Sequence, residues 1–173
     1  MKGRKLAILM FVLINMLFVD KYGARITGWH AIVSGTYALV TIGVLWILEH
    51  LIHKIAHPGR WVACIAILML TAAIGLQYTI DPIAIQVDRW SAIHNFLQGM
   101  LQGEYPYGQQ THLGGYGSPL PIWQILHLPF YAMGNVGLSI IVVLGLLIYT
   151  LYKTRGATCA LMITCMLIIS PAL

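Results

Sequence analysis

Apolar residues occur along this chain in long uninterrupted segments that are separated by short polar links. A helix needs roughly 20 consecutive, mostly apolar residues to cross a bilayer. Five segments approach or reach that length: 6–19, 30–48, 61–80, 136–152 and 157–173. The first is short, but Lys5 and Lys21 can extend from its ends toward the lipid headgroups. The pattern predicts an all-α protein, a multi-pass transmembrane helical bundle that forms a single membrane domain over residues 1–173.

Composition supports a membrane environment. The chain is 59% hydrophobic and 9% charged, whereas a soluble domain carries roughly 25% charged residues. A net charge of +5 would suggest a nucleic-acid partner in a soluble protein, but these basic residues lie at segment ends. We therefore expect a lipid bilayer as the partner and no nucleic acid. The three cysteines lie within apolar segments and form no CxxC pair, which is typical of buried thiols and not of a disulfide framework.

The distribution of Lys and Arg predicts the orientation of these spans. With a cytoplasmic N-terminus and residues 81–134 outside, only Lys21, Arg25 and Arg89 of the basic residues fall outside. Those inside are Lys2, Arg4, Lys5, Lys54, Arg60, Lys153 and Arg155. This arrangement follows the positive-inside rule. We expect a multi-pass protein of the cell membrane (plasma or inner membrane). Because the last apolar segment has no polar tail, we also expect an N-terminal fragment of a longer protein.

The outside loop, 81–134, begins with a predicted amphipathic helix that lies at the membrane interface. Asp81-Pro82 is a helix-start signal, and Gly103 is a stop signal. Helical spacing places five apolar residues on one face: Ile83, Val87, Trp90, Leu97 and Leu101. A second stripe is polar and is expected to face water: Asp88, Ser91, Asn95 and Gln98.

The sequence after this helix, EYPYGQQTHLGGYGSPLP, predicts an ordered loop that is rich in turns. Four glycines between Gly108 and Gly117 would let the backbone approach a ligand closely. An alternative interpretation is a structural crossover whose tyrosines anchor at the headgroup level, because aromatic belts are common there.

Several short motifs follow one another along this region. In chain order they are Asp88-Arg89-Trp90, Ala92, Leu101, Gly103, Tyr105-Pro106-Tyr107, Ser118-Pro119-Leu120-Pro121 and Leu128-Pro129-Phe130-Tyr131. Together with the preceding span, this order of motifs resembles the C-type glycosyltransferase superfamily. Those are multi-pass membrane enzymes that use polyprenyl-phosphate sugar donors at the outer face of the membrane. The resemblance implies a glycosyltransferase whose partner is a polyprenyl-phosphate-linked sugar, and that this chain is the N-terminal part of such an enzyme.

The resemblance implies that Asp88 is the catalytic carboxylate near the acceptor. An acceptor hydroxyl has a high pKa and needs a base or an aligning carboxylate, with a divalent cation such as Mg or Mn as a further option. The implied substrate-binding residues are Arg89, Glu104, Tyr105, Tyr107 and His112. In the alternative interpretation Asp88 is a helix-surface carboxylate that pairs with Arg89 or with a lipid headgroup, and His112 is an ordinary loop residue.

Two other interpretations remain open. Residues His50, His53 and His57 follow each other at i, i+3 and i+7 beside Glu49, a spacing that would place three imidazoles on one helical face for a metal ion. The remaining histidines complete no such set, and we expect no metal site. The alternative function is a non-catalytic multi-pass membrane protein, either a transporter subunit or an assembly scaffold. Few ionisable residues lie within the spans, which disfavours a polar translocation path.

Overall fold

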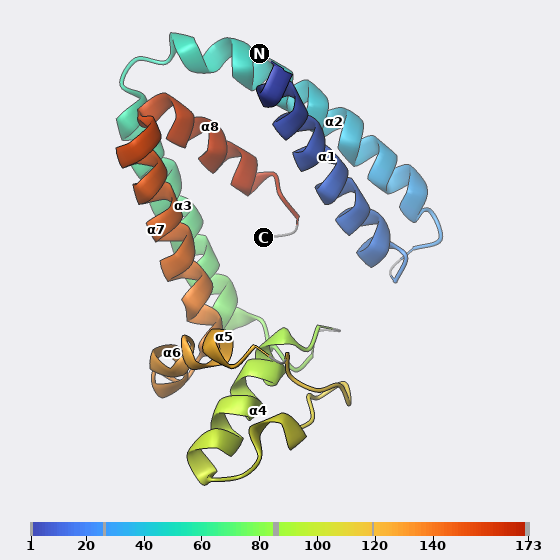
Figure 1. Cartoon of the computed structure of the whole chain (residues 1–173). Coiled ribbons are helices and arrows are strands. Elements are labelled where there is room, and N and C mark those ends of the chain that lie inside the picture. Colours follow the sequence, from blue (N-terminus) through green and yellow to red (C-terminus); the bar gives the residue numbers. More distant parts are fainter. Residues whose placement is uncertain (1, 26, 85–86, 119, 172–173) are drawn as a thin grey trace. The chain divides into compact units, whose positions relative to one another are not determined.

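The structure, a computed structural model, describes residues 2–25, 27–84, 87–118 and 120–171 (Figure 1). Within these residues the regular secondary structure is helical, apart from one isolated bridge between Gln110 and Tyr116. The longer helices are α1 (Lys2–Gly23), α2 (His30–Leu51), α3 (Pro58–Thr79), α4 (Arg89–Gln102), α7 (Ser139–Arg155) and α8 (Ala157–Ile168). Short helices are α5 (Pro121–Ile125) and α6 (Leu128–Ala132), with 3-10 turns η1 (Ile52–Lys54), η2 (Pro106–Gly108) and η3 (Val136–Leu138). The predicted all-α class is confirmed.

Four helical segments are long and apolar enough to cross a membrane: Lys5–Gly23, His30–Lys54, Pro58–Thr79 and Val136–Arg155. The first has 19 residues, about 28 Å at the helical rise of about 1.5 Å per residue, which approaches the roughly 30 Å hydrocarbon core. Most side chains along these helices are exposed in the isolated chain, as expected for surfaces that face lipid.

The helix in the last predicted span, 157–173, is shorter in the structure than the sequence suggests. Helix α8 has 12 residues and ends at Ile168, a length of about 18 Å that is short for a crossing. Pro171 follows shortly after this end, and a proline lacks the N–H that would continue the helical hydrogen bonds. Residues 172–173 of the predicted span lie outside the described residues.

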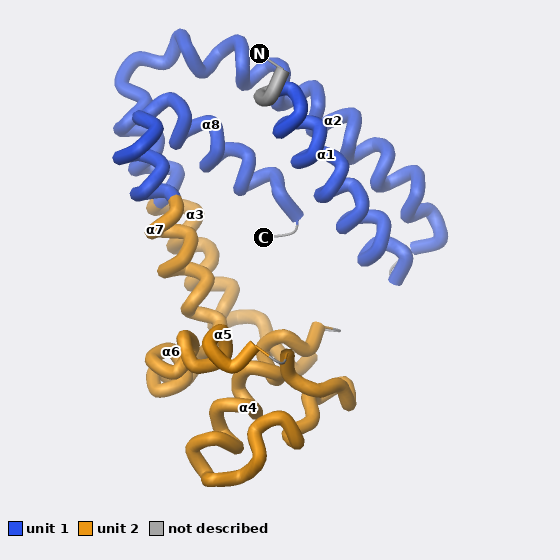
Figure 2. The backbone as a smooth tube through the Cα atoms, in the orientation of Figure 1, with its two compact units in different colours: residues 1–66, 148–173 blue, residues 67–147 orange. Residues whose placement is uncertain are grey.

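The chain divides into two compact units (Figure 2). Unit 1 contains residues 1–66 and 148–173, and unit 2 contains residues 67–147. Helices α3 and α7 each contribute one part to each unit.

Unit 1 is an α1–α2 hairpin with α8, and polar contacts join its helices. At the connection between α1 and α2, His30 Nδ1 lies 2.7 Å from Asp20 Oδ1. Farther along, the Tyr37 hydroxyl donates to the Ile169 carbonyl at 2.8 Å, and the Ser170 hydroxyl donates to Asn15 Oδ1 at 2.6 Å. Hydrogen bonds of this kind hold helices together where the surroundings are apolar.

Unit 2 contains the ends of α3 and α7 nearest the 81–134 region, together with α4, α5 and α6. Its buried core consists of Phe96, Leu97 and Val136. Half-buried side chains pack against it: Trp90, Ile93, Met100, Tyr107, Leu128 and Tyr131. The apolar face of α4 is therefore covered by α6, η3 and the loop that follows α4. Of the apolar residues predicted on this face, Trp90 and Leu97 contribute to the core, whereas Ile83 and Leu101 are exposed.

The helix predicted over 81–103 begins later than expected. The Asp81 carboxylate accepts from the Ile83 N–H at 2.9 Å, and the Ala84 N–H donates to the Asp81 carbonyl at 3.1 Å. This local turn satisfies the backbone without a helix, and α4 begins only at Arg89. Residues 85–86 lie outside the described residues. The predicted stop is confirmed, because Gly103 takes a left-handed conformation with φ 75° and closes the helix.

Candidate functional site at the start of helix α4

The side chain of Asp88 turns toward the loop that follows α4. Asp88 occupies the N-cap position, but its carboxylate makes no capping hydrogen bond with the first turn of α4. Instead, Asp88 Oδ2 accepts a hydrogen bond from the Thr111 hydroxyl at 3.1 Å. Its other oxygen, Oδ1, has no hydrogen-bond partner among the described residues. The carboxylate is thus half-buried and fixed by one oxygen, with the second oxygen available as an acceptor.

A tight turn between Thr111 and Gly115 holds the partner of Asp88 in place. The Thr111 N–H donates to the Gly115 carbonyl at 2.8 Å, and the Gly115 N–H donates to the Thr111 hydroxyl oxygen at 3.0 Å. Gly114 has φ +79°, a conformation that favours glycine. A Cβ at Gly115 would lie 2.9 Å from Asp88 Oδ2, so only glycine lets the backbone approach the carboxylate this closely.

His112 joins the same cluster through Ser91. The Ser91 hydroxyl and His112 Nδ1 lie 2.7 Å apart, and the His112 N–H donates to the Ser91 oxygen at 3.3 Å. The Ser91 hydroxyl also donates to the Asp88 carbonyl at 3.1 Å. One turn further along α4, Asn95 Nδ2 donates to the Gln110 carbonyl at 2.7 Å.

The predicted polar stripe of α4 is therefore a docking surface for the loop and is not simply a face open to water. Ser91 is only 3% exposed, and Asp88, Ser91 and Asn95 all contact residues 110–112. Gln98 alone of the predicted stripe is exposed. The expectation of a water-facing stripe was wrong because the side-chain donors and acceptors of α4 pair with loop groups that would otherwise be unsatisfied.

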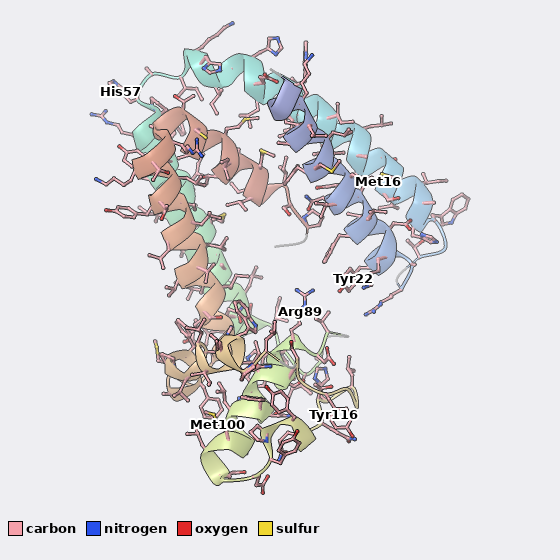
Figure 3. All side chains as sticks on the ribbon, in the orientation of Figure 1. Met16, Tyr22, His57, Arg89, Met100 and Tyr116 are labelled. Atoms are coloured by element: carbon pink, nitrogen blue, oxygen red, sulfur yellow. The ribbon has the colours of Figure 1, made fainter. Side chains whose placement is uncertain are left out.

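Several of the other predicted site residues do not contact Asp88. Arg89 is exposed at the start of α4 and makes no ion pair with Asp88 or with any other described residue (Figure 3). Glu104 and Tyr105 follow the opposite end of α4, a helix of 14 residues and about 20 Å. There the Glu104 carboxylate accepts from Gln109 Nε2 at 2.6 Å. Tyr107 packs edge-on against Phe96, with ring centroids 5.0 Å apart.

His94 lies on another face of α4, within an aromatic stack. Its ring is nearly parallel to that of Trp90 with centroids 4.5 Å apart, and the Tyr131 ring lies 4.9 Å away. Burial in this stack lowers the pKa of His94 from its ordinary value, because the charged imidazolium loses hydration there. The neutral form is favoured, which suits a stacking role.

Sequence patterns did not identify several polar residues that organise this unit. Asn135 Oδ1 accepts from Trp90 Nε1 at 3.0 Å and from the Gly137 N–H at 2.9 Å, while its Nδ2 donates to the Gln77 carbonyl at 3.0 Å. Gln124 is 1% exposed, and its Oε1 is buried with no partner among the described residues. A glutamine within an otherwise apolar segment was the available signal for Gln124.

The histidine pattern at 50–57 does not form the face that its spacing suggested. Helix α2 ends at Leu51, the 3-10 turn η1 follows, and His57 has φ 57°, outside a right-handed helix. His50 Nδ1 contacts the Trp46 carbonyl at 2.8 Å. Across the part of the chain that the structure describes, no group of three His, Cys, Asp or Glu residues is arranged to hold a metal ion. The residues around Asp88 likewise supply one carboxylate and no full ligand set.

This arrangement can orient a hydroxyl group. A carboxylate with one oxygen anchored and the other free accepts a hydrogen bond, and then a proton, from a hydroxyl that is brought against it.

Comparison with protein-family models found no match, and comparison with curated proteins and with solved structures found no significant match.

Proposed function

We propose that this chain belongs to an integral membrane glycosyltransferase that transfers a sugar from a polyprenyl-phosphate donor to an acceptor. The motifs around Asp88, Tyr105-Pro106-Tyr107 and Leu128-Pro129-Phe130-Tyr131 support it by their resemblance to C-type glycosyltransferases. The observation that carries the proposal is the half-buried Asp88 carboxylate, whose Oδ2 accepts from the Thr111 hydroxyl while Oδ1 has no partner among the described residues.

In this proposal Asp88 Oδ1 accepts the hydrogen bond of the acceptor hydroxyl. As the acceptor oxygen forms its bond to the anomeric carbon, the bond from that carbon to the donor phosphate breaks. The hydroxyl proton passes to Asp88, and the polyprenyl phosphate leaves with the bonding electrons. A positioned base of this kind contributes typically about 10² to 10⁴-fold to a rate.

The proposed reaction takes place at the outer face of the cell membrane. The four candidate spans support this, because with the expected cytoplasmic N-terminus the 81–134 region falls outside and most Lys and Arg residues fall inside. This position suits a lipid-linked sugar donor, since its lipid tail stays in the bilayer while its sugar reaches the aqueous side.

The test compares two Asp→Asn variants in membranes that contain the protein expressed from its complete reading frame. Asp88→Asn keeps the size of the side chain and an acceptor for Thr111 but removes the negative charge. We expect sugar transfer from a radiolabelled polyprenyl-phosphate sugar to fall by about 10² to 10⁴-fold. Asp81→Asn is the matched control, because Asp81 is exposed and its turn needs only a side-chain acceptor.

Equal transfer by the two variants would overturn the catalytic role of Asp88. Absence of transfer from the unsubstituted protein, across polyprenyl-phosphate sugars of different types, would favour the alternative of a non-catalytic membrane protein.

A further inference from the structure

The surface of residues 120–133 in unit 2, around α5 and at the end of α6, is strongly apolar. Six large apolar side chains between residues 120 and 133 are exposed: Leu120, Ile122, Trp123, Ile125, Leu126 and Met133. Ile122 is 74% exposed and Leu126 is 61% exposed. No Asp, Glu, Lys or Arg occurs anywhere between Glu104 and Lys153. Contiguous apolar surface of this kind marks an interaction site.

The polar side chains of the same segment face inward. Gln124 is 1% exposed and His127 is 4% exposed. His127 Nδ1 bonds to the Trp123 carbonyl at 2.7 Å, so its polar group is satisfied within the segment. Short helices in water bury their apolar residues and expose their polar ones. The reverse order in residues 120–127 is what an apolar solvent requires, because polar groups that face lipid lose their hydrogen bonds to water.

The segment also lies at the boundary of two membrane-spanning helices. Asn135, immediately before η3, donates to the carbonyl of Gln77 in the last turns of α3 and accepts from the N–H of Gly137 just before α7. These bonds fix the end of α3 beside the beginning of α7, and α5 and α6 are attached at this point (Figure 1). Because α3 and α7 are long enough to cross the bilayer, their joined ends mark the level of its surface.

Helix α4 does not offer such a surface. Its apolar residues Phe96 and Leu97 are buried against Val136 and neighbouring side chains of the protein. The larger exposed apolar surface of this region therefore lies in residues 120–133, although α4 has the clearer amphipathic pattern in the sequence.

We propose that residues 120–133 form a membrane-inserted surface whose exposed apolar side chains, around α5 and at the end of α6, lie at the boundary between lipid headgroups and acyl chains. The occupant is the lipid bilayer, because the surface continues directly into the exposed faces of the α3 and α7 spans and carries no charge that would select a protein partner. Trp123 belongs to the residue types that are enriched at this depth. This proposal does not depend on sugar transfer.

The experiment measures the surroundings of nitroxide spin labels in the whole protein, reconstituted in phosphatidylcholine bilayers. Single cysteines replace Ile122 and Leu126 in a background where Cys64, Cys159 and Cys165 are changed to Ala. The matched control is Gln98→Cys, on the exposed polar side of α4 in the same unit. We expect the ratio of collisions with oxygen, which dissolves in lipid, to collisions with a water-soluble nickel complex to be several-fold higher at residues 122 and 126 than at residue 98.

Two results would overturn the proposal. A collision ratio at residues 122 and 126 equal to that at residue 98 would show that the surface faces water. Low collision rates with both reagents at residues 122 and 126 would show that another protein surface covers them.

Discussion

The cluster at the start of α4 depends on glycine as much as on its charged residue. Asp88 keeps its orientation because Thr111 donates to it and because Gly115 has no Cβ, which would lie 2.9 Å from the carboxylate. The sequence singled out Asp88 and His112 through their chemistry and through the family resemblance. It placed Ser91 in the polar stripe but did not predict its contact with the loop, and it carried no signal for Thr111, because such pairings are a property of the folded loop.

His94 should make the stability of unit 2 depend on pH. Burial lowers its pKa below the ordinary value of 6.5, so below about pH 6.5 the unfolded chain binds more protons than the folded chain does. Stability therefore falls as the pH decreases through this range, and the loss is complete once the pH is below the lowered pKa. We expect thermal unfolding in bilayers to move to lower temperature between about pH 7.5 and about pH 5.5.

The comparison variant for this effect is His94→Phe, which keeps an aromatic ring between Trp90 and Tyr131 but does not titrate. Its unfolding temperature should decrease less on acidification than that of the unsubstituted protein. An identical decrease in both proteins would assign the pH dependence to other histidines.

Among the elements, one amide side chain makes hydrogen bonds with α3, α4 and the turn before α7. Asn135 makes three hydrogen bonds, with Trp90, Gly137 and Gln77. Changing Asn135 to Ala leaves these half-buried groups without partners, at a cost of about 1–3 kcal/mol for each group that water does not reach. We expect Asn135→Ala to lower the unfolding temperature of the reconstituted protein and to increase protease cleavage within residues 81–134.

Gln98→Ala is the control for this change, because Gln98 is exposed on α4 and makes no hydrogen bond among the described residues. If Asn135→Ala behaved like Gln98→Ala in both assays, the three hydrogen bonds would not hold the elements together.

Hydrophobic segments and glycine predicted the elements better than the polar pattern did. The spans near 30–48 and 61–80 coincide with long helices, and Gly103 ends α4 as expected from its left-handed conformation. The start of α4 was misplaced because Asp81 closes a local turn with Ile83, and Asp-Pro signals both a turn and a helix start. The spacing of His50, His53 and His57 was misleading because the chain leaves the helix after Leu51.

For the whole molecule, four helices that are long and apolar enough to cross a membrane give an even number of crossings between the N-terminus and residue 155. The proposed reaction and the expected orientation both require Asp88 outside and the loop that contains Lys54 in the cytoplasm. The segments were visible in the sequence because a bilayer demands long apolar helices. The docking of the 109–117 loop on α4 was not visible, since it depends on individual hydrogen bonds between distant residues.

The side of the membrane on which α4 lies is the most direct test of this account. Gln98 is exposed on α4, unlike the buried Ser91, and Lys54 is exposed in the turn after α2. Each is changed to Cys in the cysteine-free background, and intact cells are treated with a membrane-impermeant maleimide before and after permeabilisation. We predict labelling of residue 98 in intact cells and labelling of residue 54 only after permeabilisation. The reverse pattern would place Asp88 in the cytoplasm and contradict the proposed function.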